Sequence, residues 1–447
     1  MKSKLLCIAL SVIMLFAVVG CGDNSGAQSQ NGGNDTAKQE GNTNLSWDEV
    51  KALIPSDANG KTIEVISWNK LTDVTGAQQV VDNFTKETDI KVKWTLFNGT
   101  MADYRTKVVA LVSSKQSPDV VRLDNLHLGL LKVLQPLNKV NYNFSDSAWD
   151  TRVMDFYTLG GNTYATNLRN TLIQQPRTLI YNKNLINKFD LEDPYTLWKQ
   201  GAWTLEKFEE VCQGFTDQCD ESSYAWTSYV MSDIADIYAA SMIKREGDKF
   251  VSNMSDPNLL KGWQKITSLR EAGITNNMRF DLTNFENGKV LFFSESPIGA
   301  RTTHYYFQTL KSQGALGLVP YPTAEGGTKA ALWGEVEAYG IPKGAPNADL
   351  APYFLRYYLD ADNYDKNTFF PDKTMLDVYE TLMQSEEIFA NVDRALITED
   401  VGVSGDKMCH GIINVKPAQV KSKLDEYAPL VDAAVKSAND AVSKLGK

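Results

Sequence analysis

The sequence predicts an α/β protein, in which helices connect the parallel strands of a sheet. Two observations support this fold class. Strand-like and helix-like segments alternate between residues 62 and 123. The chain has 447 residues, and about 400 of them remain after an N-terminal export signal and a polar tether, which is enough for two domains. The nucleotide-binding versions of such folds are excluded, because no Gly-x-Gly-x-x-Gly or Gly-x-x-x-x-Gly-Lys motif follows a predicted strand.

The first 20 residues have the pattern of a secretory signal peptide. Lys2 and Lys4 precede an uncharged run from Leu5 to Gly20, which is shorter than the roughly 20 apolar residues that span a bilayer comfortably. The sequence Val18-Val19-Gly20-Cys21 resembles a bacterial lipobox, in which the cysteine is lipidated and becomes the new N-terminus. We therefore expect lipidation at Cys21. The alternative is an ordinary signal peptide that ends near a cysteine.

Residues 21–45 are expected to form a disordered tether. The stretch from Gly22 to Asn44 has no aromatic residue and no β-branched residue except threonine, so it cannot bury a core. A flexible chain of about 23 residues has a root-mean-square span of roughly 25 Å. Such a tether would hold a folded domain close to a membrane surface.

The charge of the chain argues against nucleic acid and anionic lipid as partners. The net charge is −10 and the pI is about 5.1. Loss of the signal peptide removes two lysines, so the mature chain is more acidic still. No segment rich in lysine or arginine remains to bind phosphate groups. We expect contact with the membrane through the N-terminal lipid only.

The segments between residues 62 and 123 follow the order β-α-β-α-β. Val80, Val81 and Phe84 recur at helical spacing, whereas the segment from Ile90 to Leu96 alternates as a strand with one buried face does. We predict a strand over 62–67, a helix over 74–88, a strand over 90–96, a helix over 101–113 and a strand over 119–123. This order implies parallel strands with right-handed crossovers. In such sheets ligands bind beyond the carboxyl ends of the strands.

Three cysteines remain in the body of the chain, Cys212, Cys219 and Cys409. If one helix runs through Cys212 and Cys219, they lie about 10 Å apart and cannot form a disulfide. If the helix ends near Gly214, a turn could bring them together. No Cys-x-x-Cys pair or histidine cluster accompanies them, so we expect no metal site.

Catalysis is disfavoured by the motifs that the sequence lacks. It contains no Gly-x-Ser-x-Gly and no His-Glu-x-x-His motif, and its three histidines are far apart in the chain: His127, His304 and His410. A glycosidase needs two carboxylates that flank one bond. Paired acids occur at Glu209-Glu210, Glu335/Glu337 and Glu386-Glu387, and the first and third lie in sequence that is typical of solvated helices. Folding could still bring distant carboxylates together.

Eight segments stand in an order that resembles a known family: the opening strand that ends at Trp68, KETDIKVKW, SPDVVRLD, TLIYNKNLI, GAWTLEKFEEVC, FENGKVLFF, LGLVPYPT and LWGEVEAYGIPKGAPNADLAPYFLRYYL. The chain resembles the extracellular solute-binding lipoproteins of ABC importers, specifically the carbohydrate-binding group that includes maltose-binding proteins. The resemblance extends from about Lys61 to Val435.

The resemblance implies a two-lobe, periplasmic-binding-protein-like fold of type II. Each lobe would be a mixed sheet flanked by helices, with a ligand cleft between the lobes. Lobe one would span 46–172 with a return segment at 336–372, and lobe two 173–335 with C-terminal helices at 373–447. Crossing strands would lie near 174–181 and 333–341.

The implied function is capture of a carbohydrate and its delivery to permease subunits of an ABC transporter. The protein would be a monomer without a cofactor or a catalytic residue. The alternatives are a surface-anchored carbohydrate-active enzyme, or a binder of a non-sugar solute such as a peptide or polyamine.

Candidate ligand-binding residues follow from position and from the resemblance. They stand at the predicted strand ends (Trp68, Asn69, Asp124, Asn125), at the first crossing (Asn167, Arg169, Gln175), in two segments where relatives contact ligand (Trp226, Ser232, Asp233; Ser294, Glu295, Ser296, Arg301), and at the second crossing (Trp333, Gly334, Glu335). Amides and carboxylates at strand ends could bind sugar hydroxyls or could cap the next helix.

Trp333 is the leading aromatic candidate, because Gly334 beside it would let a ligand approach the backbone. Many relatives carry a tryptophan near Ile298, where this chain does not. Other tryptophans are expected to be structural. Trp198 and Trp203 would fix a loop before a helix that starts near Thr204, and Trp47 follows a helix cap at Ser46.

Overall fold

The computed structural model describes residues 44–228, 237–276, 281–324, 332–386, 389–400 and 405–445. The signal peptide, Cys21, most of the expected tether, Ser232 and Asp233 lie outside these residues. For Trp333 and Gly334 the structure describes the backbone. In the described part of the chain, no helix is both long enough and apolar enough to cross a bilayer.

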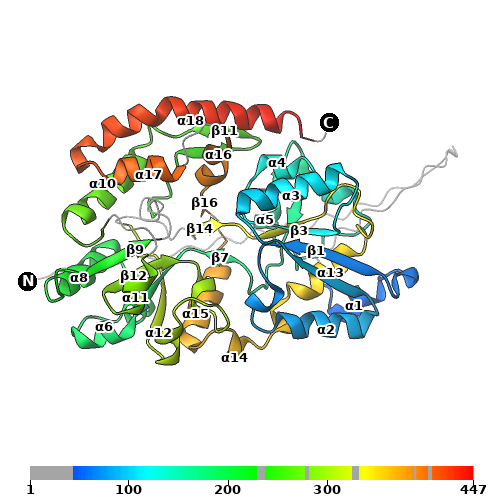
Figure 1. The fold of residues 1–447 in the computed structure, drawn as a ribbon, viewed down its shortest axis with the longest axis horizontal. Coiled ribbons are helices and arrows are strands. Elements are labelled where there is room, and N and C mark those ends of the chain that lie inside the picture. Colours follow the sequence, from blue (N-terminus) through cyan, green and yellow to red (C-terminus); the bar gives the residue numbers. More distant parts are fainter. Residues whose placement is uncertain are drawn as a thin grey trace, which may run out of the picture. The chain divides into compact units, whose positions relative to one another are not determined.

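A five-stranded sheet contains the predicted β-α-β-α-β unit (Figure 1). Its order is β2 (Lys91–Leu96), β1 (Thr62–Ser67), β3 (Val120–Leu123), β15 (Ala338–Gly340) and β6 (Ala165–Thr166). β1 pairs in parallel with β2 and β3, whereas β15 is antiparallel to β3 and β6. The parallel arrangement predicted from the sequence is therefore confirmed, with α2 (Ala77–Thr88) and α3 (Met101–Ser113) as the connecting helices.

Local sequence signals explain where these helices begin and end. Thr100 caps α3 and forms a capping box with Asp103, and α2 ends at Asp89, which has a left-handed φ of 58°. α1 (Trp47–Ala52) begins at the predicted cap, where the Ser46 hydroxyl accepts a hydrogen bond from the Glu49 N–H. Trp47 is structural as expected, because its ring packs 4.6 Å from that of Tyr357 in α13 (Ala351–Tyr358).

A second sheet has the order β13 (Leu316–Pro320), β8 (Thr178–Asn182), β12 (Val290–Glu295) and β9 (Tyr224–Ser228). β8 is antiparallel to its two neighbours, and β12 is parallel to β9. α8 (Leu205–Thr216) packs against β9, and α15 (Lys373–Met383) packs against β13. Trp203 is buried and donates its indole N–H to the carbonyl of Pro320 at 2.8 Å, which confirms its structural role.

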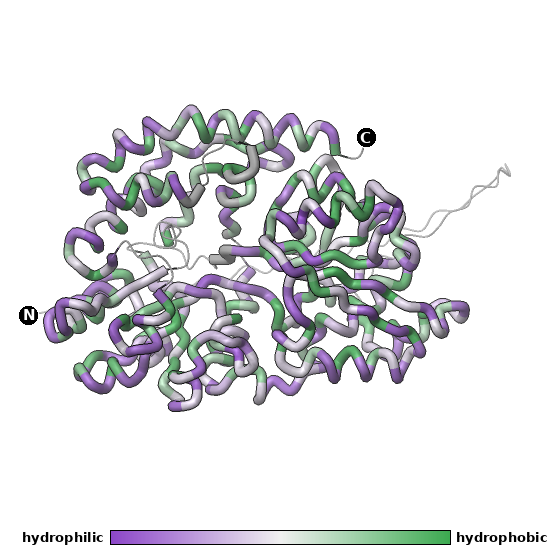
Figure 2. Tube along the Cα trace, in the orientation of Figure 1, coloured by the Kyte–Doolittle hydropathy of each residue, from purple (hydrophilic) through white to green (hydrophobic). Residues whose placement is uncertain are grey.

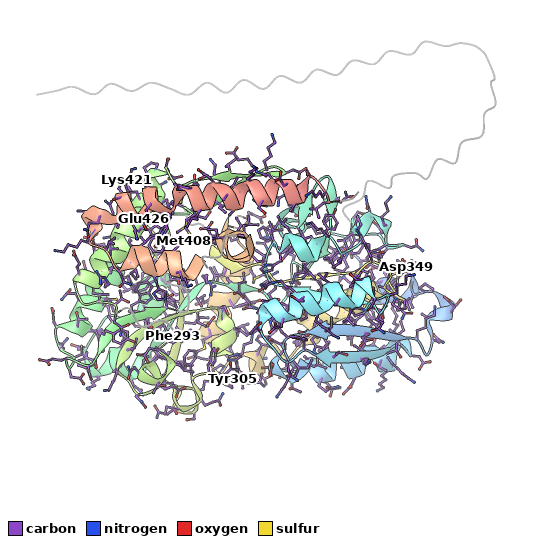
Figure 3. The ribbon with its side chains drawn as sticks, turned by 45° about the horizontal axis from the view of Figure 1, so that its top comes forward. Phe293, Tyr305, Asp349, Met408, Lys421 and Glu426 are labelled. Carbon is purple, nitrogen blue, oxygen red and sulfur yellow. The ribbon has the colours of Figure 1, made fainter. Side chains whose placement is uncertain are left out.

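The predicted C-terminal helix is α18 (Val420–Val442), which packs against the hairpin of β10 (Ile243–Glu246) and β11 (Lys249–Ser252). It also contacts α10 (Pro257–Glu271), α16 (Asp393–Asp400) and α17 (Gly405–Ile413). Hydrophobic and hydrophilic residues alternate along α18, as expected for a helix with one buried face (Figure 2). Lys421 and Glu426 lie on its exposed side, and Met408 of α17 is buried (Figure 3).

A small three-stranded sheet joins the two larger ones. Its order is β16 (Phe389–Ala390), β14 (Leu332–Glu335) and β7 (Gln175–Pro176). β7 leads directly into β8 of the second sheet, and β14 leads directly into β15 of the first. The chain therefore passes between the sheets at the two positions where crossing strands were expected. The domain boundaries themselves remain predictions.

The remaining elements are short and surround these sheets: α4 (Leu128–Leu131), α5 (Thr151–Phe156), β4 (Thr158–Leu159), β5 (Asn162–Thr163), α6 (Lys183–Lys188), α7 (Pro194–Lys199), α11 (Leu282–Glu286), α12 (Gln308–Ser312) and α14 (Lys366–Phe369). Short 3-10 helices lie at Ser56–Ala58, Leu71–Asp73, Leu137–Lys139, Pro297–Ala300, Ala361–Asn363 and Pro417–Gln419.

A disulfide between Cys212 and Cys219 was expected if the helix that contains Cys212 ended near Gly214. The structure contradicts this expectation. α8 continues to Thr216, beyond Gly214, and both cysteines are free thiols. Cys212 faces the core, and the Cys219 thiol donates to the carbonyl of Thr216 at 3.7 Å. Burial raises the pKa of the Cys212 thiol well above its ordinary value, which disfavours the reactive thiolate.

Candidate functional site

The candidate site lies where the carboxyl ends of β1 and β3 meet the second crossing. Trp68 follows β1, and Asp124 follows β3. The backbone carbonyl of Asp124 accepts a hydrogen bond from the Val336 N–H at 2.9 Å, and the Tyr157 hydroxyl donates to the Val336 carbonyl at 2.7 Å. Val336 directly follows β14, so these bonds fix the end of β3 beside the crossing strand.

Trp68 is partly buried and has close neighbours at its ring. The guanidinium carbon of Arg122 lies 4.6 Å from the centroid of the Trp68 ring. Tyr104 of α3 meets the ring edge-on, with 4.9 Å between the centroids. The Tyr104 hydroxyl bonds to the backbone of both strands, since it donates to the carbonyls of Ile66 and Arg122 at 3.1 Å. The strand ends therefore hold one partly exposed aromatic ring in a defined orientation.

Arg122 and Glu337 form a fully buried ion pair behind Trp68. Nε and Nη2 of Arg122 each lie 2.6 Å from one carboxylate oxygen of Glu337, which is the strong two-bonded geometry of a guanidinium and a carboxylate. Burial raises the pKa of Glu337 to about 7, although Arg122 acts in the opposite direction. Gln175 of β7 donates a further hydrogen bond to Oε1 of Glu337.

A second charged group stands at the same crossing. Arg177 lies 4.0 Å from a carboxylate oxygen of Glu295 and 4.0 Å from one of Glu335. The Ser296 N–H donates to Glu295 at 2.7 Å, and the Ser296 hydroxyl bonds to Gln175 at 3.3 Å. Burial raises the pKa of Glu295 to about 7. The side chain of Glu335 is 22% exposed, so it is the most accessible carboxylate of this group.

Asp124 offers a carboxylate at the end of β3, the strand that pairs with β1. Its side chain is 14% exposed, and Oδ1 lies 3.3 Å from Nε2 of His127. Arg105 of α3 approaches the same nitrogen of His127 at 3.2 Å. A partly exposed carboxylate within such a network can accept hydrogen bonds from hydroxyl groups without the cost of burying an isolated charge.

Several candidate residues use their polar groups inside the protein. The Asn125 amide donates to the carbonyl of Asn391 at 3.0 Å, and the Asn167 amide donates to the carbonyl of Glu337 at 2.9 Å. Arg301 is buried and donates to the carbonyl of Leu172 at 2.8 Å. These side chains stabilise the fold around the site.

Trp226 belongs to the core of the second sheet. Its ring is fully buried, and its indole N–H donates to the hydroxyl of Ser294 at 2.8 Å. Ser294 is itself fully buried. A ligand could reach this pair only if the sheet opened, so the structure places both residues away from the candidate surface.

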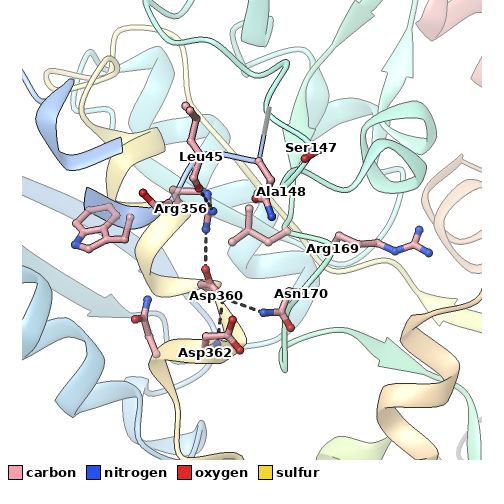
Figure 4. Close-up of a pocket in the computed structure, with 13 residues that line it drawn as sticks. Leu45, Ser147, Ala148, Arg169, Asn170, Arg356, Asp360 and Asp362 are labelled. Atoms are coloured by element: carbon pink, nitrogen blue, oxygen red, sulfur yellow. Dashed lines mark hydrogen bonds and ion pairs between the residues drawn. The ribbon is translucent and has the colours of Figure 1, made fainter. Parts of the chain in front are cut away.

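Arg169 lies in a different place. It donates to the carbonyl of Gln384 at 3.1 Å and to the carboxylate of Glu386 at 3.0 Å. It lines a separate pocket of about 560 Å³, together with residues that include Trp47 and Asp360 (Figure 4). The structure does not bring Arg169 together with Trp68 and Asp124 by any described contact.

Asn69, Trp333 and Gly334 are placed mainly by their backbones. The Asn69 carbonyl accepts a hydrogen bond from the indole N–H of Trp94 at 3.0 Å. Trp333 and Gly334 stand in β14, with Trp333 opposite Pro176 of β7 and Ala390 of β16. The second crossing is thus a strand, as expected from the sequence.

The sequence reasoning missed Arg122 and Arg177 and did not single out Glu337 as a site residue. A signal was present for Arg122 and for Glu337. Arg122 interrupts the apolar strand Val120–Leu123, and Glu337 stands between Val336 and Ala338. A charged residue in a short buried strand needs a partner of opposite charge, so such positions could have been paired in advance.

Comparison with known families identifies the chain. The sequence profile of the bacterial extracellular solute-binding proteins matches residues 79–368. This chain belongs to that family. No curated protein sequence matches it.

Solved structures of solute-binding proteins resemble the chain over most of its length. The extracellular solute-binding protein of Staphylococcus aureus, in complex with maltose, has a TM-score of 0.60 at 14% identity, and the match covers 84% of this chain and 98% of that one. The sugar-binding protein of Xanthomonas citri gives 0.59 at 15% identity, covering 86% and 98%.

The galacto-N-biose/lacto-N-biose I-binding protein of Bifidobacterium longum, in complex with lacto-N-biose, gives 0.60 at 15% identity, covering 84% and 97%. Likeness at this level of identity shows the fold. The chain is an α/β protein of the two-lobe, type II periplasmic-binding class, as the resemblance implied.

Proposed function

We propose that this chain is the lipid-anchored solute-binding component of an ABC transporter and that it captures a carbohydrate, an oligosaccharide, between its lobes. The observation that carries the proposal is that the partly exposed Trp68 and the carboxylate of Asp124 follow the carboxyl ends of two paired parallel strands. Sugar rings stack their C–H faces on aromatic rings, and their hydroxyls bond to carboxylates. Recognition sites of α/β proteins form at this edge of the sheet.

The ligand contacts in this proposal come from candidates at the strand ends and at the crossings. Trp68 and Trp333 supply aromatic surface, while Asp124 and Glu335 accept hydrogen bonds from hydroxyls. The maltose and lacto-N-biose complexes of the fold relatives support a saccharide as the ligand class. Asn69, Gln175 and the segment that contains Ser232 and Asp233 complete the proposed surface.

Binding without chemical change is favoured over glycoside hydrolysis. Hydrolysis needs one carboxylic acid and one carboxylate that both face the scissile bond. Glu337 has a pKa suited to an acid, but it is fully buried and both of its oxygens bond to Arg122. Glu295 is almost as buried and accepts a hydrogen bond from its neighbour's N–H. Neither carboxyl group is presented to a substrate.

Anchoring at the membrane would bring the protein to its permease. The expected lipid at Cys21 and the tether over 21–45 precede the folded chain, which is fixed at Leu45 by bonds to Asp146 and Arg356. The tether is short enough to keep the protein near the transporter and flexible enough to allow docking. The protein acts as a monomer in this proposal.

A thermal-shift screen tests the proposal directly. The purified protein is heated with neutral mono- and oligosaccharides, peptides and polyamines in separate samples. A saccharide present at 100 times its Kd should stabilise the protein by about 2.7 kcal/mol. A stabilising peptide or polyamine, with no response to any saccharide, would contradict carbohydrate binding. Consumption of the saccharide would favour an enzyme.

A further inference from the structure

We propose that Arg122 is a positioning residue for the carbohydrate, because it holds the indole ring of Trp68 in the orientation that receives a sugar face. The inference rests on the proposed function and adds a residue to it. Arg122 is buried, so it acts through Trp68 and does not contact the saccharide.

Geometry supports the first link, between Arg122 and Trp68. The guanidinium carbon lies 4.6 Å from the ring centroid, which is within the range of a cation–π interaction. Because Arg122 is only 3% exposed, water screens this attraction weakly. A cation over one face of the ring excludes a sugar from that face, so a stacked sugar would have to use the other one.

The second link holds Arg122 itself. Both of its bonds to Glu337 are 2.6 Å long, and two parallel bonds fix the plane of a guanidinium as well as its position. The backbone of Arg122 is held as well, since its N–H donates to the Tyr104 hydroxyl at 3.1 Å. Tyr104 also packs against the Trp68 ring at a steep interplanar angle of 79°. The ring is therefore contacted by groups that are themselves fixed.

The third link connects the ring to the crossing strands. Gln175 of β7 bonds to the carboxylate of Glu337 and to the hydroxyl of Ser296, which follows β12 of the second sheet. The amide of Gln174 donates to the carbonyl of Glu337 at 2.7 Å. The orientation of Trp68 thus depends on side chains at the point where the chain passes between its two sheets.

Two variants test the role of Arg122. Arg122→Met keeps an unbranched side chain and removes the cation. The double variant Arg122→Met/Glu337→Gln also removes the negative charge of Glu337, which would otherwise stay buried without a partner. If Arg122→Met does not fold, the double variant tests the role of Arg122 in its place. Arg356→Met is the matched control, because Arg356 is also buried and ion-paired, at 2.7 Å from Asp360.

The readouts are the affinity for maltose, maltotetraose and lacto-N-biose by calorimetry, and the fluorescence of Trp68. The Trp68 signal is isolated as the difference between each protein and its Trp68→Phe counterpart, since the chain has nine tryptophans. We expect binding of the responding saccharide to weaken roughly fivefold to thirtyfold in both Arg122 variants. Acrylamide should quench Trp68 more strongly in the free variants, and Arg356→Met should change neither readout.

Unchanged affinity together with unchanged quenching of Trp68 in the Arg122 variants would overturn the proposal. Equal binding by the wild type and Trp68→Ala would overturn it too, because the ring would then not be a platform. If none of the three saccharides binds to the wild type, carbohydrate binding fails for these probes. The quenching of Trp68 in the free protein then still decides whether Arg122 holds the ring.

Discussion

Replacement of Glu295 by glutamine should make the protein more stable above neutral pH and reduce the pH dependence of its stability. Burial raises the pKa of Glu295 from an ordinary value of 4.5 to about 7, although Arg177 and the Ser296 N–H oppose this effect. Between these two values the folded protein keeps a proton that the unfolded chain has lost. The free energy of unfolding therefore falls as the pH rises through this window.

The size of the effect follows from the two pKa values. A difference of about 2.5 pH units, at about 1.4 kcal/mol per unit, corresponds to about 3 kcal/mol. This contribution is fully present below pH 4.5 and is lost above pH 7. Glutamine keeps an oxygen that can accept the hydrogen bond from the Ser296 N–H, and it carries no charge to bury. The variant should therefore lose most of this pH dependence.

Urea unfolding at several pH values between 5 and 8 measures the effect. In the steep part of the window, the wild-type free energy should fall by up to about 1.4 kcal/mol per pH unit more than that of Glu295→Gln. Glu337 and Asp393, whose pKa values are also raised to about 7 by burial, contribute equally to both proteins. Glu426→Gln, at an exposed carboxylate of α18, should follow the wild type.

Two results would refute this reasoning. Identical pH dependence in the wild type and Glu295→Gln would show that Glu295 does not hold a proton near neutral pH. If Glu295→Gln is less stable than the wild type at pH 8, the attraction between Arg177 and the Glu295 carboxylate contributes more to stability than the burial of that charge costs.

Three further predictions concern other parts of the chain. Trp333→Ala should weaken saccharide binding by about 2 kcal/mol, roughly thirtyfold, with little change in the melting temperature of the free protein; a large loss of stability with unchanged affinity would make Trp333 a packing residue. Cys21→Ser should release the protein from the membrane or leave its signal peptide uncleaved, and retention of the processed variant in a detergent phase would contradict lipid anchoring. Reducing agent should leave the melting temperature unchanged, because Cys212 and Cys219 are free thiols; a clear decrease would reveal a disulfide.

The core of the fold could be predicted because its signals are local. Alternation in the segment from Ile90 to Leu96 and the helical spacing of Val80, Val81 and Phe84 each depend on a few neighbouring residues, and β2 and α2 formed where these signals stood. The strand order could be inferred only in part. β15 joins the first sheet next to β3 although more than 200 residues separate them in the chain, and only the resemblance indicated this return.

The candidate site was predicted less well, because burial decides which polar residues can meet a ligand. The sequence gives no sign that Trp226 would be fully buried, whereas Trp68 stays partly exposed. It also does not show that Glu337 would find Arg122 across two strands, since the partners are 215 positions apart. Trp68 and Asp124 do follow strand ends, as expected, because these positions depend on the sheet alone; their contact with a ligand stays a prediction.

Equilibrium dialysis against maltotetraose, or against the saccharide that stabilises the protein most, tests the central claim most directly. The account predicts one bound saccharide per chain, recovered with unchanged mass after long incubation, and a large loss of binding in Trp68→Ala and Asp124→Asn variants that retain their fold. Recovery of a cleaved or isomerised product, or full binding by both variants, would contradict it.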